Sequence, residues 1–559
     1  MILTPESRIK EYTAKGWWGD DTILDLLYAR AAVRPDAEAL VDPYNKQALV
    51  GLEPARMTYG QMVRAIDKLA AEFLRLGLGR DDVVIVQLPN IIELTLTIFA
   101  AARAGAIVSP IPVQWRGHEL RHAAALTGAK AMVTSHNALG FDHLKPAREI
   151  LGDAVGVFIT VGAGPAEGAI QMADILAGPE VDPALLAGKQ SGPNDIFTLC
   201  WTSGTEAASK AVPRSHNHWL SISRTAVESF LPDGECVYLS LFPTINMAGL
   251  GAVLIPWVIT GGKMVFHHPF DLGVFLRQLG AEKVHYTLAP PALLDSLAKS
   301  PQWAAMDRGA LSVIGSGSAP LSAWMVKTFQ EKFNIGIINF FASNEGVGLY
   351  SSPKDFPNPE DRAGFFPRFG VEGFNWKSES TKGVKSRLVD PHTEREITEP
   401  GVVGELRYDG PTVFPGYYKA PELTAKAFDG QGYFKTGDLF AIAGDHNEKY
   451  LFQGRHKDLI IRGGVNISPE EIETLVSGHP KVAEAAAVGS PDERLGERIC
   501  VFVVPAPGET VTLEEIVEYL KTQDVAKYKL PEILKIVAAL PRSPVGKVLK
   551  RDLRVALRD

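Results

Sequence analysis

A loop that suits polyphosphate binding follows an apolar segment in the middle of the sequence. Residues 196–201 are largely apolar and lead into a glycine- and hydroxyl-rich stretch; the groups it offers are Thr202, Ser203, Gly204, Thr205 and Lys210. Backbone N–H groups, hydroxyls and a lysine charge all bind phosphate oxygens. The spacing differs from GxxxxGK[ST], which argues against a P-loop NTPase. Taken alone, such a segment is more often a polar surface turn, so its meaning depends on what accompanies it.

The composition excludes several classes of protein. The chain of 559 residues carries a formal net charge of −8, which argues against nucleic-acid binding as the main activity. Its three cysteines are widely spaced and form no CxxC pair, as expected in a reducing compartment. The N-terminus lacks the apolar core of a secretory signal. The longest apolar run, 247–262, is shorter than the roughly 20 residues of a membrane span. We therefore expect a cytoplasmic protein with no membrane span.

Helix and strand patterns alternate through most of the chain. Thr58 and Gln61 predict a capped helix start, and strand-like and helical runs then succeed one another to about residue 190. Such alternation predicts a mostly parallel, doubly wound sheet. A second block of the same kind follows, then short glycine-rich strands over 401–452 and a compact αβ unit. In this last unit, Ser468 with Glu471 predicts a capping box.

The predicted fold is therefore α/β with two domains. The large N-terminal domain contains two doubly wound αβ sheets and a small β-rich subdomain, and a small α+β domain follows it. The predicted bounds are 1–455 for the N-terminal domain, with subdomains at about 1–190, 191–350 and 351–455, and 456–559 for the C-terminal domain.

The loop at 195–216, DIFTLCWTSGTEAASKAVPRSH, resembles the phosphate-binding signature of the adenylate-forming (ANL) superfamily of AMP-dependent synthetases and ligases. This superfamily includes acyl-CoA synthetases, aryl-acid adenylating enzymes and beetle luciferases. Further segments match it in the same order along the chain. They are FFASNE at 340–345, then GEL, GYYKAPELTAKAF and GYFKTGDL within 404–439, then GRHKDLIIRGGVNISPEEIE at 454–473, and PRSPVGKVLKRDL at 541–553.

The resemblance implies roles for individual residues in binding ATP and Mg²⁺. Glu345 is expected to hold Mg²⁺, and Asn344 to donate a hydrogen bond to the α-phosphate or the acyl carbonyl. Asp438 is expected to accept hydrogen bonds from the ribose hydroxyls, with Arg455 on the ribose and phosphate side. Lys547 is implied as the catalytic lysine that binds the carboxylate and the α-phosphate, where a cation stabilises the developing charge. The remaining implied nucleotide contacts are Gly317, Ser318, Ala319, Pro320, Phe340, Phe341 and Ala342.

The same resemblance implies a mobile C-terminal domain. Lys547 lies about 90 residues beyond the predicted boundary, so that domain must deliver it to the site. Lys457 is the implied hinge, and the Gly463-Gly464 loop is implied to admit the pantetheine arm of coenzyme A in a second pose. A solvated basic helix is the alternative interpretation of the region around Lys547, and we predict that Lys550, Arg551 and Arg554 are surface charges.

Several positions depart from the family pattern. Glu206 and Ala207 alter the phosphate loop, and Ser318 stands where glycine is commoner. Ala342 and Asn344 replace the usual glycine and threonine. The implied acyl pocket is Phe242, Asn246, Met247 and Gly249, in which Asn246-Met247 stands where aryl-acid members carry His-Asn. An apolar Met247 argues against a ring-hydroxyl contact and favours a medium-sized apolar acid, alicyclic or aromatic.

The sequence therefore predicts an AMP-forming acid–CoA ligase that uses ATP, Mg²⁺ and coenzyme A. Two alternatives remain open. The first is a stand-alone adenylating enzyme that loads a carrier protein. The second is a non-catalytic nucleotide-binding protein, which is supported only by the departures at Glu206 and Ala207. A homodimer is compatible with the sequence and is not required by it.

Overall fold

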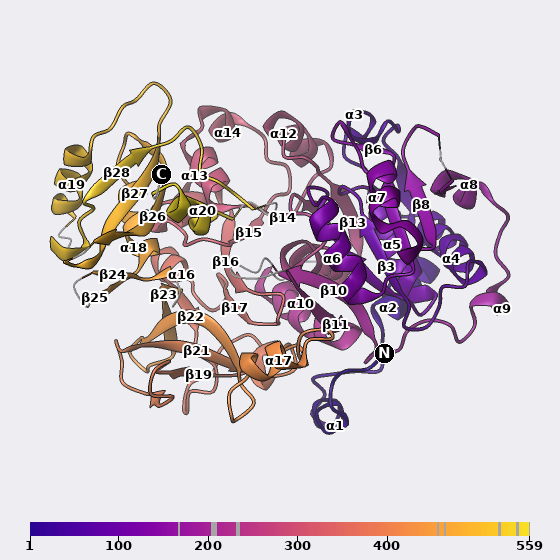
Figure 1. The fold of residues 1–559 in the computed structure, drawn as a ribbon, viewed down its shortest axis with the longest axis horizontal. Coiled ribbons are helices and arrows are strands. Elements are labelled where there is room, and N and C mark those ends of the chain that lie inside the picture. Colours follow the sequence, from indigo (N-terminus) through magenta and orange to yellow (C-terminus); the bar gives the residue numbers. More distant parts are fainter. Residues whose placement is uncertain are drawn as a thin grey trace.

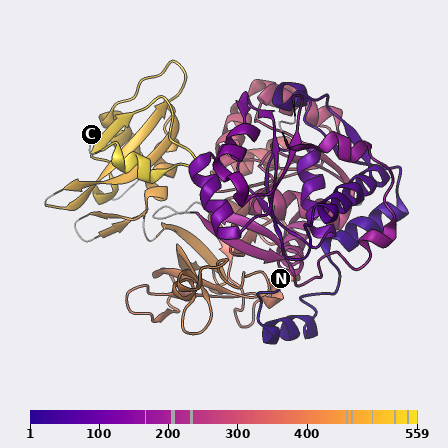
Figure 2. The same cartoon turned by 45° about the vertical axis from the view of Figure 1, so that its right-hand side comes forward.

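The computed structural model describes residues 1–559 except 166–167, 203–208, 231–234, 456–457, 463–464, 493, 524–526, 544–546 and 558–559. The chain forms a large N-terminal body and a smaller C-terminal domain, the gold part that stands to one side in Figures 1 and 2. Two αβ sheets and a β-rich subdomain make up the body, and a further sheet lies in the C-terminal domain. The predicted α/β architecture is confirmed.

The first sheet is parallel inside and antiparallel at its two edges. Parallel strands are covered on both faces, which explains their continuous apolar runs. The strand order is β17 (Gly348–Ser351), β16 (Gly336–Ala342), β15 (Val313–Gly317), β14 (Tyr286–Leu288), β12 (Cys236–Ser240), β13 (Gly262–Phe266), β1 (Glu38–Val41) and β2 (Arg56–Thr58).

The second sheet has a similar design, with a parallel interior and an antiparallel hairpin at one edge. Its order is β11 (Lys210–Ser215), β10 (Ile196–Thr202), β4 (Ile107–Pro110), β3 (Val83–Gln87), β5 (Ala131–Ser135), β8 (Val157–Val161) and β9 (Ile170–Gln171). A separate short hairpin consists of β6 (Asn137–Ala138) and β7 (Phe141–Asp142).

The two sheets share a middle layer of helices, because successive side chains of each strand face opposite layers. In β3, Val84 and Val86 join the core between the sheets, while Val83 and Ile85 pack against outer helices. The middle layer contains α2 (Ile23–Val33), α4 (Tyr59–Arg75), α5 (Ile92–Arg103), α10 (His216–Phe230), the π-helix η2 (Met247–Leu254) and α11 (Ile255–Thr260). The outer layers contain α6 (Gly117–Thr127) and α7 (Leu144–Leu151) on one side, and α12 (Leu272–Ala281), α13 (Pro291–Lys299), α14 (Pro301–Ala305) and α15 (Ala323–Phe333) on the other.

Local sequence signals explain several of these elements. Thr58 Oγ1 accepts a hydrogen bond from the Gln61 backbone N–H, and Gln61 Oε1 accepts one from the Thr58 backbone N–H. The predicted capping box at the start of α4 is therefore present. The apolar run at 247–262 forms the buried helices η2 and α11, rather than a membrane span. Within the described residues, every helix is too short or too polar to cross a membrane. The remaining helices of the body are α1 (Glu6–Ala14), α3 (Lys46–Val50), α8 (Met172–Ala177), α9 (Pro183–Leu186), α16 (Pro359–Gly364) and α17 (Pro421–Ala427).

The first αβ sheet is not made from one continuous stretch of the chain. The β1–β2 hairpin, from the first 60 residues, completes the sheet whose other strands lie between 236 and 351. All strands of the second sheet lie between these two parts, from β3 to the β10–β11 hairpin at 196–215. The second sheet is therefore inserted in the sequence between the two parts of the first.

The β-rich subdomain packs around aromatic side chains. Phe341, at the end of β16, contacts Phe366, Phe440 and Phe452 with ring centroids 5.1 to 5.7 Å apart, distances typical of favourable aromatic pairs. This cluster joins the first sheet to the subdomain. The subdomain sheet has the order β18 (Phe365–Pro367), β23 (Lys449–Arg455), β22 (Phe434–Ala443), β21 (Val403–Asp409), β19 (Lys385–Val389) and β20 (Glu396–Ile397).

The C-terminal domain is an αβ unit in which the apolar strand β27 lies between neighbours, as predicted for residues 499–504. Ser468 caps α18 through the Glu471 N–H, but the predicted capping box is incomplete because the Glu471 carboxylate pairs with Lys529 instead. The strands are β25 (Val465–Ile467), β24 (Ile460–Arg462), β27 (Gly496–Pro505), β26 (Val482–Asp492) and β28 (Ile533–Ile536), and the helices are α18 (Pro469–Ser477), α19 (Leu513–Thr522) and α20 (Lys550–Val555).

Lys550 is not the surface charge that the sequence suggested. Its ammonium group lies 2.8 Å from Glu470 and 3.0 Å from Glu473, and all three side chains are largely buried. Burial raises the pKa of Glu473 to about 7, against the opposing charge of Lys550. The sequence around Lys550 suggests a solvent-exposed lysine, because the two acids that cover it belong to α18, about 80 residues earlier.

The raised pKa of Glu473 predicts a pH-dependent stability. A carboxyl whose pKa is higher in the folded state binds its proton more tightly there, so its protonation stabilises the fold below about pH 7 and this contribution is lost as the pH rises. Glu473→Gln should therefore gain stability relative to wild type between pH 5 and pH 8, by about 1–3 kcal/mol. Urea denaturation at both pH values measures this, with the exposed Glu518→Gln as the control. A difference that is constant with pH would contradict it.

Candidate functional site

The predicted phosphate loop connects the two strands of an edge hairpin. Thr202 ends β10 and Lys210 begins β11, and the two residues are paired across the hairpin. The other predicted phosphate-loop residues, Ser203, Gly204 and Thr205, lie outside the described residues, as do Glu206 and Ala207. The hairpin β16–β17, at the edge of the first sheet, carries Asn344 and Glu345 in its turn, and the Asn344 side chain reaches the end of β10 at Trp201.

Lys210 and Glu345 meet through a tyrosine that the sequence analysis did not select. The Tyr417 hydroxyl donates to Glu345 Oε1 at 3.1 Å, and Lys210 Nζ lies 3.4 Å from the same hydroxyl and 4.4 Å from the ring centroid. Burial and the Glu345 charge raise the pKa of Tyr417, so the hydroxyl stays protonated and remains a donor. The only sequence signal for Tyr417 is its place in the GYYK segment.

Asn344 joins the two sheets. Its Nδ2 donates to the Trp201 carbonyl oxygen at 3.1 Å, and its Oδ1 accepts from the Met247 N–H at 2.8 Å. The side chain thus links β10, the β16–β17 turn and the start of η2. This connection accounts for an amide at a position where the family usually has threonine, since the amide donates and accepts through two separate atoms, whereas a hydroxyl would have to serve both partners through one oxygen.

Arg214 supports the same turn from within the core. Its guanidinium is buried and donates to the carbonyl oxygens of Asn344, His218 and Thr412 at 2.9 to 3.1 Å. Burial lowers its pKa to about 10, which leaves it protonated at neutral pH. Arg214 was not selected from the sequence. Its sequence signal is an arginine inside an otherwise buried strand, AVPRS.

The segment after β15 has the geometry expected of a close backbone approach. A side chain at Gly317 would lie 2.2 Å from the Phe340 carbonyl oxygen, so only glycine fits there. Ser318 has φ of +75°, the left-handed conformation that explains why glycine is commoner at this position. Ser318, Ala319 and Pro320 are exposed, whereas Phe340 is buried against the core. Phe341 packs into the subdomain cluster and Ala342 is exposed.

The predicted acyl-pocket segment surrounds the N-terminus of η2. Asn246 caps this helix, because its Oδ1 accepts from the N–H groups of Ala248 and Gly249 at 3.1 and 3.4 Å. Gly249 is required sterically, since a Cβ there would lie 2.2 Å from the Pro243 carbonyl oxygen. Phe242 and Met247 are buried.

Charges from both domains converge at the strand pair β22–β23. Asp438 and Arg455 face each other across these strands, with Arg455 Nε 2.9 Å from Asp438 Oδ1. Burial raises the pKa of Asp438, and the charges of Arg455 and Lys547 oppose that rise. Lys547 is exposed and lies in the C-terminal domain, and its charge acts on Asp438 from there.

Close packing at the domain junction accompanies this arrangement. A Cβ at Gly454 of β23 would lie 2.6 Å from Glu470 Oε2 and 2.9 Å from Ser468 Oγ, both at the N-terminus of α18. The predicted hinge Lys457 and the predicted pantetheine residues Gly463 and Gly464 lie outside the described residues.

Comparison with known proteins gives matches over most of the chain. Residues 27–418 match the family model of the AMP-binding enzyme, and residues 471–547 match that of the AMP-binding enzyme C-terminal domain. A salicylyl-CoA synthase / salicylate adenylyltransferase from Streptomyces sp is 31% identical, over 100% of this chain and 98% of that protein. A medium-chain fatty-acid–CoA ligase from Escherichia coli (strain K12) is 30% identical, over 98% of this chain and 93% of that protein.

Solved structures agree with the fold. The ATP-bound structure of MatB from Rhodopseudomonas palustris superposes with a TM-score of 0.78 at 26% identity, covering 96% of this chain and 99% of that one. The apo structure of the same protein gives a TM-score of 0.70. The arrangement described above is thus more similar to the ATP-bound form than to the apo form.

The turn that carries Glu345 depends on the next residue, Gly346. Its φ is +105°, and a Cβ there would lie 1.9 Å from the Thr412 carbonyl oxygen. Gly346→Ala should therefore destabilise the fold by at least about 2 kcal/mol, through backbone strain and displaced backbone. Gly370→Ala is the matched control, because Gly370 has φ of +81° with open space around it. Equal losses for the two variants in urea denaturation would contradict the steric argument.

Proposed function

Because the chain belongs to the AMP-binding enzyme family, we propose that it is an AMP-forming acid–CoA ligase. In this proposal it condenses a carboxylic acid with ATP to give an acyl-adenylate and pyrophosphate, and then transfers the acyl group to the thiol of coenzyme A with release of AMP. The adenylating step is common to the relatives of this family, and we infer the acceptor and the acid from the residues of the site.

The observation that carries the proposal is the convergence of Lys547, Arg455 and Asp438. Adenylation brings two anions together, a carboxylate and the α-phosphate, and a cation between them stabilises the charge that develops in transfer. We assign this role to Lys547, whose charge reaches the buried Asp438 from the other domain. Asp438 would accept hydrogen bonds from the ribose hydroxyls, and Arg455 would keep its carboxylate ionised and contact the phosphate side.

The residues on the opposite side suit the triphosphate. Lys210 offers a point charge, Thr202 and the 203–205 segment offer hydroxyl and N–H donors, and Asn344 keeps spare hydrogen-bonding capacity beside them. The 317–320 and 340–342 segments would border the adenine through their exposed residues, Ser318, Ala319, Pro320 and Ala342.

Glu345 fits a Mg²⁺ ion that is held mainly by phosphates. Among the described residues, no three His, Cys, Asp or Glu side chains gather to hold a metal. Mg²⁺ commonly binds one or two carboxylates together with substrate phosphates, and Glu345 is half-buried with Tyr417 hydrogen-bonded to Oε1. When bound, the ion would neutralise phosphate charge; Tyr417 would orient the carboxylate that receives it.

The acyl side favours an apolar acid. Asn246 is engaged in capping η2, and Met247 is buried, so this segment supplies an apolar wall instead of a partner for a ring hydroxyl. A medium-sized alicyclic or aromatic acid is therefore the proposed substrate class. The relatives named above act on salicylate and on medium-chain fatty acids, so both belong in the test panel.

Acid-dependent ATP–pyrophosphate exchange tests the adenylation step. With a panel of cyclohexanecarboxylate, benzoate, salicylate and octanoate, exchange should be fastest with the acids that lack a ring hydroxyl. Formation of the CoA thioester from the active acid then tests the acceptor. Exchange without CoA-dependent AMP formation would reject the CoA ligase in favour of carrier-protein loading, and no exchange with any acid would reject both.

Lys547→Ala separates the two half-reactions. It should lower adenylation by roughly 100-fold or more, because it removes the cation from the developing charge. Thioester formation from a supplied acyl-adenylate should be largely retained, because a second pose would carry that step. Arg551→Ala, an exposed cation on α20, is the control and should leave both rates unchanged. Equal loss of both half-reactions in Lys547→Ala would refute the two-pose assignment.

A further inference from the structure

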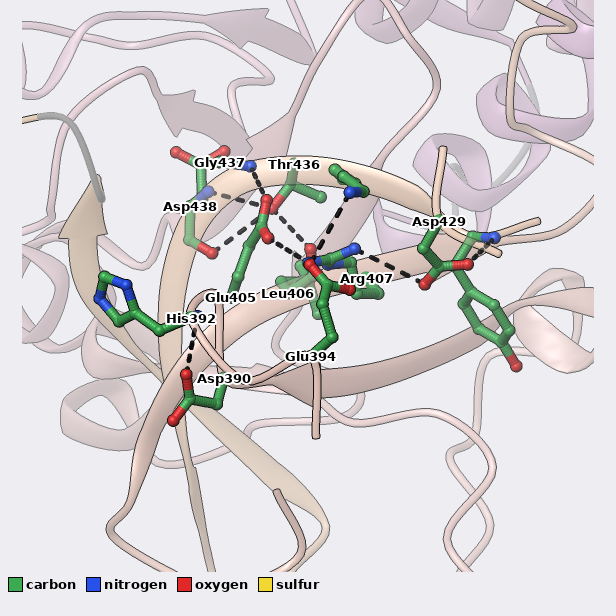
Figure 3. A network of polar contacts seen from close by, with 12 residues as sticks. Asp390, His392, Glu394, Glu405, Leu406, Arg407, Asp429, Thr436, Gly437 and Asp438 are labelled. Atoms are coloured by element: carbon green, nitrogen blue, oxygen red, sulfur yellow. Dashed lines mark hydrogen bonds and ion pairs between the residues drawn. The ribbon is translucent and has the colours of Figure 1, made fainter. Parts of the chain in front are cut away.

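A group of charged residues lies beside the turn that carries Asp438 (Figure 3), and all of its side chains are buried except that of Glu394. Arg407 of β21 is 1% exposed, and its Nη2 lies 2.8 Å from Glu405 Oε2 and 3.1 Å from Glu394 Oε1. Its Nη1 lies 3.7 Å from Asp429 Oδ2. We call Arg407, Glu394, Glu405 and Asp429 the Arg407 cluster. The roles proposed above use none of these residues.

The acids of the Arg407 cluster neutralise charge in the sheet, which places three cations side by side on neighbouring strands. Arg407 is in register with Arg387 of β19 and Lys435 of β22. Like charges directly opposite on neighbouring strands are destabilising. The acids of the cluster offset them, since Asp429 also lies 2.7 Å from Arg387 and Glu394 lies 3.8 Å from Lys435. Arg407 is thereby left with Glu405 as its nearest partner.

Glu405 connects Arg407 to the turn that carries Asp438. One carboxylate oxygen pairs with Arg407, and the other, Oε1, accepts from the Gly437 N–H at 2.9 Å. Gly437 has φ of +71°, a conformation that few other residues adopt. The Thr436 hydroxyl adds a second anchor by donating to the Leu406 carbonyl oxygen at 2.8 Å. The Asp438 N–H then donates to Thr436 Oγ1 at 3.1 Å, which completes the turn.

We propose that Glu405 and Arg407 are positioning residues that fix the Asp438 carboxylate for the ribose of the nucleotide. The inference rests on the proposed nucleotide role of Asp438 and adds the two residues that hold its carboxylate in position. A buried carboxylate held by an arginine keeps one orientation, and removal of either partner leaves the other uncompensated. The turn would then relax, and Asp438 would lose its alignment while remaining chemically intact.

Ribose discrimination is the readout that a merely structural role would not move. The variants are Glu405→Ala, Glu405→Gln, Arg407→Met and Asp438→Asn. Glu396→Gln is the matched control, because Glu396 is half-exposed on the same sheet and pairs with Arg387 instead. Acid-dependent pyrophosphate exchange gives kcat/KM for ATP, 2′-deoxyATP and 3′-deoxyATP, and the preference is the ratio of the ATP value to each deoxy value.

Wild type and Glu396→Gln should prefer ATP over both deoxy nucleotides, and Asp438→Asn should lose most of that preference. Glu405→Ala and Arg407→Met should lower the preference at least about fivefold, as expected for the loss of a charged hydrogen bond. Glu405→Gln keeps an acceptor oxygen for the Gly437 N–H and should retain more preference than Glu405→Ala. In the Glu405→Ala/Asp438→Asn double variant no further loss is expected, because both changes act on one contact.

The failures of the two proposals are distinguishable. Loss of preference in Asp438→Asn, with full preference in Glu405→Ala and Arg407→Met, overturns the positioning role alone. A wild type without ribose preference, or an Asp438→Asn variant that keeps it, overturns the ribose role of Asp438 and the positioning role with it. Should Glu405→Ala unfold, as judged by its Tm, Glu405→Gln and Arg407→Met decide the matter in the same way.

Discussion

One buried guanidinium determines where the polar segments of the site can lie. Arg214 offers its donors to three backbone carbonyls, in the Glu345 turn, in helix α10 and in the 410–414 segment. A buried cation is costly unless its donors are satisfied. These carbonyls satisfy Nη1 and Nη2, while Nε is buried without a hydrogen-bond partner among the described residues and the guanidinium lies over the Trp219 ring. Each of the three segments is therefore fixed relative to β11, and β11 begins at Lys210. Lys210 and the Glu345 turn thus share one reference point within the core.

The domain junction combines close packing at Gly454 with a balance of charges. Around Asp438 the structure assembles Arg455 and Lys547, with Glu470 close enough to oppose them. Of these residues, Lys547 and Glu470 belong to the C-terminal domain, so any movement of that domain would change the balance of charge at Asp438. An anionic nucleotide would add to the attraction for Lys547. Under the proposed function, nucleotide binding and domain placement would be coupled by the same electrostatic interaction.

The sequence predicts the parts of this protein that depend on local rules. The alternation of helix and strand patterns predicts the parallel sheets, and Thr58 with Gln61 predicts the start of α4. Both depend on residues that are close together along the chain. Ser318 was recognised as unusual, and its positive φ explains why. Tyr417 and Arg214 were missed, since Glu345 and Thr412, which they contact, lie far away in sequence. Arg407 was missed because its burial depends on the tertiary packing of the sheet. The Glu471 capping box and the solvated Lys550 were wrong for the same reason, because distant Lys529 and Glu470 compete for these side chains.

The insertion of the second αβ sheet within the first has a consequence for how the chain is synthesised. The β1–β2 edge of the first sheet lies in the first 60 residues, but its partner strand β13 begins only at residue 262, after the whole second sheet has been translated. Contacts of such high sequence separation form slowly, and unfinished sheet edges are prone to aggregate. In a growing chain on the ribosome, the first hairpin must therefore remain without its partner strand until that strand is translated. A cut near residue 190, between the first two predicted subdomains, would separate β10–β11 from the second sheet and β1–β2 from the first.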